Sequence, residues 1–252
     1  MAEVDLLRAP GFGDGRTVVH GFTARRGGSW PAPDGLTLAR AEGVPDACLA
    51  DHWTRALHAV DPRLEPARLA LASQVHGARV IRVEAPTGPL ATAGEADALV
   101  TTVPGLALAV RIADCVPVLL ATDGGVAAVH AGWRGVVAGV VGAAVDALRE
   151  ATGASDVEAA VGPHLGVDAF EVGPEVVEAL EAAGLPRADV AHPGRRDRWQ
   201  VDLGRAVGLQ LAAAGVARVA RTGGSTWDPR FFSWRREGPA AGRQAGIVAW
   251  RP

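Results

Sequence analysis

The chain has 252 residues and a formal net charge of −3, and its only cysteines are Cys48 and Cys115. That length suits one large domain or two small ones and is enough to bury a sizeable core. Every basic Lys+Arg residue is arginine, and tyrosine is also absent. These absences exclude a pyridoxal-phosphate Schiff base, a Walker A phosphate loop and a phenolic acid or base. The mild acidity argues against nucleic acid or an anionic membrane as a partner.

Apolar patterning and turn residues predict the elements along the chain. Strands are expected at 18–23, 68–75, 79–84, 98–102, 106–113, 116–121, 126–129, 157–161, 216–220 and 247–250. Helices are expected at 46–60, 135–150, 174–183 and 201–214. Strands outnumber helices and several follow one another directly, which indicates the α+β class. No apolar segment is long enough to cross a bilayer and no signal peptide is visible, so a cytoplasmic protein is expected.

Three metal-capable side chains share one position in the predicted elements. His76, Cys115 and His130 each lie at the carboxyl end of a predicted strand, where open sheets tend to place ligands. Two histidines and one cysteine match a catalytic zinc site with three protein ligands and one open position. The same residues are also compatible with a buried apolar cysteine and two histidines that bond locally.

The segment after His130 predicts an anion site. His130 opens the sequence His-Ala-Gly-Trp-Arg-Gly, which leads into the helix expected at 135–150. A glycine-rich turn at a helix N-terminus offers unpaired N–H groups and a partial positive charge. Arg134 adds a donor suited to a phosphate or carboxylate. A tight connection between strand and helix would explain the same glycines.

Two further side chains adjoin the predicted metal ligands. Gln74 shares a strand face with His76 in an extended chain, where its amide would read a nucleobase edge or orient a ligand. Asp114 precedes Cys115 and is expected to point to the other face of a regular strand. We therefore expect Asp114 to be a supporting acid rather than a ligand.

More distant candidates come from loops. Arg25 lies in an Arg-Arg-Gly-Gly loop that is able to close the site from the N-terminal side. Arg235 belongs to the segment 231–236, whose aromatic and arginine residues form either a stacking platform or an ordinary surface. His164 lies in a turn after a strand and is a candidate to approach the site.

Several motifs carry a family resemblance along nearly the whole chain. They are Ser73-Gln-Val-His-Gly77, Glu95-Ala-Asp-Ala-Leu-Val-Thr101, Ala113-Asp-Cys-Val-Pro-Val118, Val129-His-Ala-Gly-Trp-Arg-Gly135, Gly162-Pro-His-Leu-Gly166, Phe170-Glu-Val172, Phe232-Ser-Trp-Arg-Arg236 and Gly242-Arg243. With these motifs the chain resembles the YfiH family, whose members are described as laccase-domain or polyphenol oxidase proteins and as purine nucleoside phosphorylases. The Ala-Asp-Cys-x-Pro and His-Ala-Gly-Trp-Arg-Gly motifs are the most specific.

The resemblance implies a fold, a metal and a chemistry. It implies a single α+β domain over residues 1–252, with mixed β-sheets flanked by helices, of the YfiH/CNF-like type. It implies that His76, Cys115 and His130 bind zinc. It further implies phosphorolysis of adenosine, inosine, guanosine and methylthioadenosine, and deamination of adenosine. Bacterial relatives are also linked to peptidoglycan editing.

For this chemistry the partners are a purine nucleoside and phosphate, and a monomer or small homo-oligomer is expected. Arg134, Arg25 and the N-terminus of the helix at 135–150 are the candidates to hold phosphate. Asp114 and His164 are the candidates to move the proton. Where family members usually carry tyrosine, this chain has Phe170 and Trp234, so chemistry that depends on a phenol is not expected here.

Three other functions stay open. A copper-dependent phenol oxidase would suit the same ligands, although the 7 histidines include no His-x-His pair of the kind that multicopper oxidases use. A metal-free hydrolase would use Cys115 as nucleophile with His130 or His76 as base. A structural zinc protein would act through a cell-wall partner.

Overall fold

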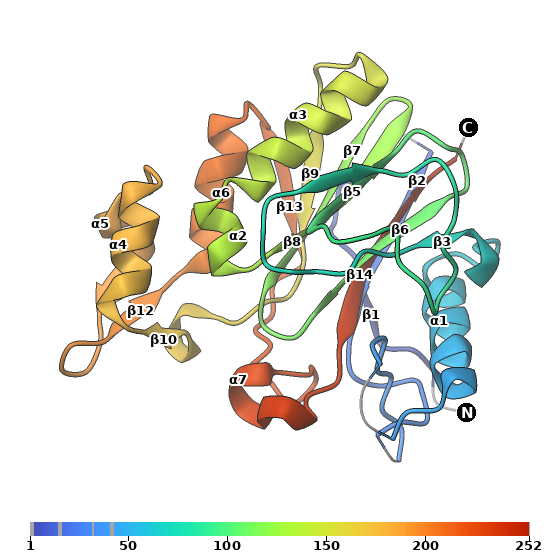
Figure 1. The fold of residues 1–252 in the computed structure, drawn as a ribbon, viewed down its shortest axis with the longest axis horizontal. Coiled ribbons are helices and arrows are strands. Elements are labelled where there is room, and N and C mark those ends of the chain that lie inside the picture. The colour runs from blue at the N-terminus through green and yellow to red at the C-terminus, as the bar shows by residue number, and fades with distance from the viewer. Residues whose placement is uncertain (1–2, 15–16, 32, 41–42, 252) are drawn as a thin grey trace.

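The computed structural model describes residues 3–14, 17–31, 33–40 and 43–251. Within these residues, two large sheets dominate the fold (Figure 1). The five-stranded sheet has the order β1 (Leu6–Leu7), β2 (Val18–Thr23), β14 (Gln244–Trp250), β6 (Ala107–Ile112) and β3 (Leu69–Ala70). The six-stranded sheet has the order β13 (Arg218–Arg221), β9 (Glu158–Val161), β7 (Val116–Thr122), β8 (Gly125–Ala131), β5 (Ala98–Thr101) and β4 (Val80–Arg82). Both sheets mix parallel and antiparallel pairs, so the expected α+β class with mixed sheets is confirmed.

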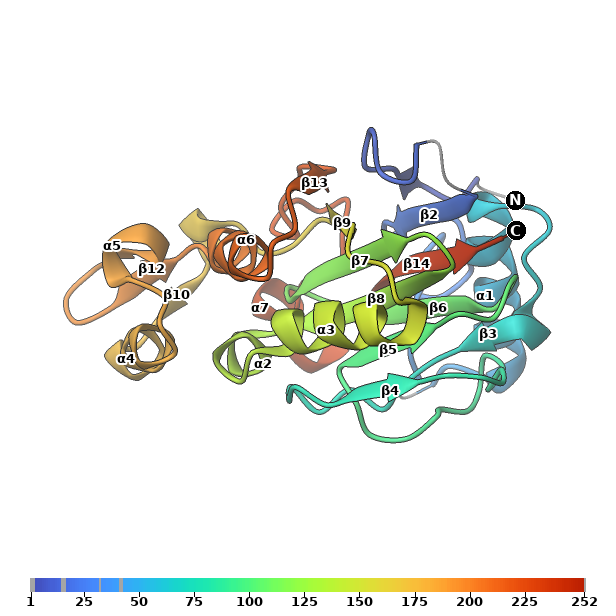
Figure 2. The ribbon, with the colours of Figure 1, turned by 90° about the horizontal axis from the view of Figure 1, so that it is seen from above.

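Helices cover the outer faces of the two stacked sheets, as Figure 2 shows from above. Helix α1 (Asp46–Val60) packs on the five-stranded sheet, and α3 (Val140–Thr152) and α6 (Leu203–Ala213) pack on the six-stranded sheet. The short helix α2 (Trp133–Val137) follows β8 directly. Single 3-10 turns are η1 (Pro66–Arg68), η2 (Val167–Ala169) and η3 (Gly238–Ala240). None of the helices in the described part of the chain combines the length and apolar character that crossing a bilayer needs.

Alternation along the central strands builds a core on each side of the six-stranded sheet. In β7, Val118 and Leu120 face the helices, whereas Leu119 and Ala121 face the other sheet. Because both faces are buried, these strands are continuous apolar runs rather than alternating polar and apolar ones. Because the strands are apolar along their length, a polar side chain on the inner face at a strand end is a candidate for function.

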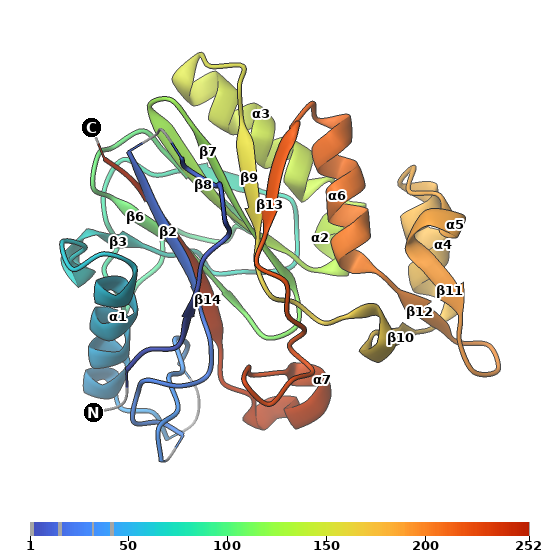
Figure 3. The same cartoon turned by 180° about the vertical axis from the view of Figure 1, so that it is seen from behind.

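A small lobe lies beside this stack. It contains β10 (Glu171–Val172), β12 (Trp199–Val201) and β11 (Ala191–Pro193) as a three-stranded sheet, with α4 (Pro174–Ala182) and α5 (Arg187–Val190). Figure 3 shows this lobe next to α6, and shows α7 (Trp234–Glu237) near the end of the strands between the lobe and β14. The lobe and α7 thus border the same end of the two sheets.

Two predicted elements differ from the structure in an informative way. The helix expected at 135–150 is divided into α2 and α3, because Gly139 has φ 82° and interrupts the helical backbone. The strand expected at 68–75 is a strand only over Leu69–Ala70, and Ser73 adds an isolated bridge to Glu95 within the loop that follows. The short β1, β10, β11, β12, α5 and α7 had no signal in the apolar pattern.

The buried His20 predicts a pH dependence of stability. Burial lowers the pKa of His20 to about 4, and the charge of Arg8 acts in the same direction. Its Nε2 accepts the backbone N–H of Ala9 at 3.0 Å, which requires the neutral ring. Between pH 6.5 and 4 the unfolded chain therefore binds a proton that the folded protein does not, so stability falls as the pH decreases. We expect this to remove about 2–3 kcal/mol from the free energy of unfolding.

Urea unfolding at pH 7 and pH 4.5 measures the loss. The variant His20→Gln keeps an acceptor for Ala9 but does not titrate, so its loss should be smaller than that of the wild type. Equal losses in the two proteins would contradict the assignment.

Candidate metal centre

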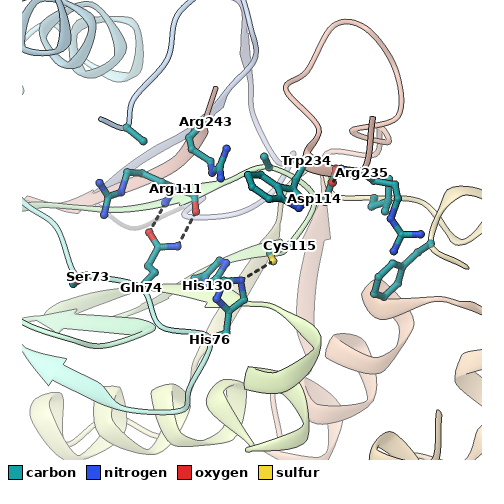
Figure 4. A pocket seen from close by; sticks show the side chains of 14 residues that line it. Ser73, Gln74, His76, Arg111, Asp114, Cys115, His130, Trp234, Arg235 and Arg243 are labelled. Carbon is teal, nitrogen blue, oxygen red and sulfur yellow. Dashed lines mark hydrogen bonds between the residues drawn. The ribbon is translucent and has the colours of Figure 1, made fainter. Parts of the chain in front are cut away.

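A cavity of about 570 Å³ lies at the end of the two sheets that the lobe and α7 border. His76, Cys115 and His130 line it together with arginine and aromatic side chains (Figure 4). A smaller cavity of about 120 Å³ adjoins it and shares His76, Asp114 and Cys115. The three residues that the sequence singled out therefore lie together in one hollow of the protein.

The geometry of these three side chains fits a metal ion. Their ligand atoms all lie within 4.8 Å of one another, and Cys115 Sγ is 3.8 Å from His76 Nε2. In a tetrahedral zinc site, nitrogen and sulfur ligands lie about 3.3–3.6 Å apart. The Cys115–His76 distance is already close to this range, and a bound ion would draw the remaining ligand atoms inward. His130 is buried, Cys115 is half-buried and His76 is exposed, which leaves one side of the cluster open to a water or substrate.

Asp97 holds the innermost ligand. Ala98 of β5 pairs with Val129 of β8, so Asp97 and His130 are cross-strand neighbours, and the N–H of His130 donates to the Asp97 carbonyl at 2.7 Å. The Nδ1–H of His130 also donates to Asp97 Oδ1 at 2.7 Å. This bond leaves Nε2 of His130 for a metal, as in carboxylate–histidine–metal arrangements.

The same carboxylate holds the loop that carries His76. The backbone N–H groups of Val75, His76 and Gly77 all donate to Asp97, at 3.2, 2.9 and 2.7 Å. His76 has φ 61°, a left-handed conformation that is unfavourable for a residue with a side chain. The three bonds stabilise this conformation and thereby set the direction of the imidazole. Although burial alone would raise it, the pKa of Asp97 is lowered by the hydrogen bonds from His130 and Gly77.

Cys115 and His130 change each other's ionisation. Burial alone would raise the pKa of the Cys115 thiol, but the positive His130 and the hydrogen bonds from both histidines lower it to about 6. Burial alone would lower the pKa of His130, but the Cys115 thiolate and Asp97 raise it to about 9. The cluster therefore favours the thiolate, which is the form that binds metals.

Gly132 allows the three ligands to approach. A Cβ atom at Gly132 would lie 2.8 Å from His76 Cδ2 and 3.1 Å from Cys115 Sγ. Both distances are shorter than ordinary packing permits. Gly132, between β8 and α2, has an extended backbone with φ −76° that any residue adopts, so the three ligands require its lack of a side chain.

The wall formed by Asp114 and α7 is polar and partly aromatic. Asp114 lies in the tight turn between β6 and β7 with φ 93°, so it lines the cavity beside Cys115 instead of pointing away from it as a regular strand would require. Its carboxylate accepts the Thr226 hydroxyl and the N–H of Arg235, both at 2.6 Å. Asp114 thus ties α7 and its neighbouring loop to the metal cluster.

The other residues predicted to contact substrate line the cavities, each with different bonding partners. Gln74 lines the cavity, but its amide is paired with the backbone of Arg111, donating to the carbonyl at 2.7 Å and accepting the N–H at 2.9 Å. Arg235 lines the cavity and donates to the Glu171 carbonyl of the lobe at 2.7 Å. Arg134 lines the smaller cavity, is exposed, and lies over the Trp133 ring.

Two predicted residues are not among those that line either cavity. Arg25 forms an ion pair with Glu237 at 2.8 Å and lies over the Phe232 ring. His164 donates from Nδ1 to the Gly162 carbonyl at 2.9 Å, and burial lowers its pKa. Both residues therefore bond to protein groups around the cavities and do not line their interiors.

The sequence reasoning missed Asp97, Arg111 and Arg243. Asp97 directly precedes an apolar strand, and an acid at the buried end of such a strand was the available signal. Arg111 and Arg243 both line the cavity, but their meeting depends on the pairing of β6 with β14, which no local pattern reveals.

Comparison with known proteins places the fold and site in a family. Residues 19–251 match the model of the family described as multi-copper polyphenol oxidoreductase laccase. A protein of Escherichia coli named purine nucleoside phosphorylase YfiH is 36% identical over 187 residues, covering 73% of this chain and 74% of that protein. The chain belongs to the YfiH family.

Other members agree in sequence and in structure. A purine nucleoside phosphorylase of Streptomyces griseus is 42% identical over 236 residues, covering 90% of this chain and 92% of that protein. The crystal structure of YlmD from Geobacillus stearothermophilus superposes with a TM-score of 0.88 at 28% identity, covering 98% of this chain and 97% of that one. The family resemblance read from the motifs is confirmed.

Removing the charge of Asp97 should weaken metal binding. In Asp97→Asn the His130 ring loses its anionic partner and the loop at 75–77 loses a strong acceptor. We expect zinc affinity to fall about 10- to 100-fold, measured by competition with a chromogenic chelator. The exposed Asp146→Asn on α3 is the matched control and should bind zinc like the wild type. An unchanged affinity in Asp97→Asn would show that the pair does not support the metal.

A methyl group at Gly132 should disturb the same centre. In Gly132→Ala the new Cβ pushes against His76 and Cys115, so zinc affinity should fall at least tenfold in the same competition. Gly142→Ala is the matched control, because no atom lies within 4 Å of a Cβ there and alanine suits the interior of α3. It should retain zinc and be slightly more stable than the wild type. Equal zinc affinities in the two variants would contradict the role of Gly132.

Proposed function

We propose that the protein is a zinc-dependent purine nucleoside enzyme that carries out phosphorolysis of adenosine, inosine, guanosine and methylthioadenosine, and deamination of adenosine. The observation that supports it most directly is the half-open His76/Cys115/His130 cluster at the base of a cavity with room for a nucleoside. The names of the relatives, purine nucleoside phosphorylase, point to the same substrate class.

His76, Cys115 and His130 would hold the metal, and their donor set suits zinc with one open position. Bound zinc would supply Lewis acidity, which lets water act as a nucleophile at neutral pH. Deamination then replaces the amino group at C6 of adenosine with oxygen from water and releases ammonia. Asp97 orients His130 and the loop of His76 throughout.

Aromatic rings on the cavity wall suit a purine base. Trp234 lines the cavity and is 49% exposed, and the Arg243 guanidinium lies over its ring at 5.3 Å. The rest of its exposed surface would be available for stacking. Phe170 lines the same cavity, with the Arg235 guanidinium over its ring at 5.4 Å. We assign Trp234, Phe170 and Arg235 to binding of the nucleoside, and Gln74 to positioning, because its amide bonds to the backbone of Arg111.

Phosphorolysis makes a second demand on the site. A phosphate oxygen forms a bond to C1′ of the ribose while the C1′–N9 bond breaks and its electron pair stays on the base. The proton of hydrogen phosphate ends on the base, so a proton carrier is needed. Asp114 is our candidate because it lines both cavities. His164 lines neither of them and would act only indirectly. Arg134 would meet the substrate from the smaller cavity.

Product analysis tests the proposed function. Purified zinc-loaded protein incubated with adenosine and phosphate should form adenine, ribose 1-phosphate and inosine. In His76→Ala, zinc content by elemental analysis and all three products should fall together, by at least a hundredfold for the products. The exposed His192→Ala on β11 is the matched control and should keep both. If the wild type forms none of the products, the proposed function is wrong.

The family description raises one alternative, a copper-dependent polyphenol oxidase. Among the described residues, one group of His, Cys, Asp or Glu side chains has metal-binding geometry. A multicopper oxidase would need several such groups. Oxygen consumption by copper-loaded protein with a phenol tests it. Turnover of phenol that exceeds turnover of nucleosides would favour this alternative.

A further inference from the structure

Arg111 and Arg243 both line the large cavity. Their guanidinium groups have no role in the function proposed above. Arg111 of β6 lies opposite Ala245 of β14, and Arg243 precedes Ala245 by two positions. Arg243 immediately precedes β14, so this register makes the two arginines diagonal neighbours within reach of long side chains. Figure 4 shows both on the same side of the metal cluster, away from Arg235, and both line the cavity.

Within the described part of the chain, neither guanidinium forms an ion pair, and the side-chain hydrogen bonds of both go to backbone carbonyls. In the described part of the chain, Arg111 donates one side-chain bond, to the Ala72 carbonyl at 2.8 Å, and Arg243 donates to the Ala241 and Gly242 carbonyls at 2.6 and 2.9 Å. Carbonyl oxygens satisfy donors but carry no full charge. The Cys115 thiolate and Asp114 both act on Arg243 through space, but Asp114 already accepts bonds from Thr226 and Arg235.

Bringing two such charges together is unfavourable without an anion. Burial lowers the pKa of Arg111, and the positive charge of Arg243 lowers it further. Both groups stay charged because a guanidinium does not lose its proton in proteins. Half-buried like charges in one cavity therefore raise the free energy of the empty site, and a bound anion would lower it.

The backbone holds both arginines in place before a ligand arrives. The two hydrogen bonds between Gln74 and the backbone of Arg111 attach β6 to the loop of His76. The N–H of Arg243 donates to the Thr37 hydroxyl at 3.1 Å, and its carbonyl accepts the N–H of Leu38 at 2.8 Å. Such prior ordering reduces the entropy that binding costs.

We propose that Arg111 and Arg243 form the binding site for inorganic phosphate beside the metal cluster, an inference that rests on the proposed phosphorolysis. Each guanidinium keeps Nε–H and Nη–H donors free of protein partners among the described residues, and a tetrahedral oxyanion accepts several such bonds at once. Arg25 is neutralised by Glu237, and Arg134 is exposed on Trp133. The phosphate would thus lie between Arg111 and Arg243, and the base would lie beside the part of Trp234 that Arg243 does not cover.

Direct binding of inorganic phosphate tests the site without any reaction. Isothermal titration calorimetry of the zinc-loaded protein should show phosphate binding that weakens at least tenfold in Arg111→Met and in Arg243→Met. Arg111→Lys keeps a charge but lacks the planar fork and should give an intermediate value. The matched control is Arg82→Met on β4, an exposed arginine, which should bind like the wild type. Thermal unfolding checks that each variant is folded, and relief of repulsion should keep Arg111→Met at least as stable as the wild type.

Kinetics then separate this inference from the proposed function. The KM for phosphate should rise at least tenfold in Arg111→Met and Arg243→Met, and the ratio of inosine to adenine formed from adenosine should rise with it. Phosphate binding that is unchanged in both variants overturns the inference, as does a raised KM in Arg134→Gln alone. Competition by a nucleoside 5′-monophosphate with no binding of inorganic phosphate also overturns it. Arginine-dependent phosphate binding without ribose 1-phosphate formation would instead reject the proposed phosphorolysis and leave the anion site standing.

Discussion

The side chain on which the candidate metal centre depends most is Asp97, through the hydrogen bonds of its buried carboxylate. One acid orients His130 from the neighbouring strand and also accepts three successive N–H groups of the loop that bears His76. A rigid strand ligand and a loop ligand in a left-handed conformation are thereby set relative to each other before any ion binds. Cys115 comes from a third segment, the turn between β6 and β7, and Gly132 leaves the room in which all three meet.

The layered fold explains why such a cluster lies where it does. The inner faces of the two sheets are apolar along β6, β7 and β8, so the sheets pack closely except where their strands end. Asp97 and His130 occupy the inner face at that end, and Trp234 and Arg235 of α7 line the cavity there together with Phe170. Burial opposes ionisation of both Cys115 and His130, but their mutual attraction and the hydrogen bonds of the cluster outweigh it, so the thiolate that a cation needs is favoured.

Much of this could be predicted from the sequence, and the exceptions have a common cause. Apolar runs revealed most long strands and helices, and the three candidate ligands stood out because each follows such a run. Asp97, Arg111 and Arg243 were missed because their roles arise from which strand pairs with which, and at what register. The helix expected at 135–150 failed at Gly139, where a single positive φ outweighs a good apolar face. Asp114 was expected to point away, but regular alternation does not apply in a tight turn with φ 93°.

Because the chain has no lysine, the positive charges of the Arg111/Arg243 pair are permanent. A buried lysine amine loses its proton readily, and it is a common site of acetylation. Guanidinium groups do neither within the range in which proteins stay folded. The positive potential at that end of the cavity is therefore constant, insensitive to alkaline conditions and to the commonest charge-removing modification. Any change in what the cavity retains must come from the anion itself or from the metal cluster next to it.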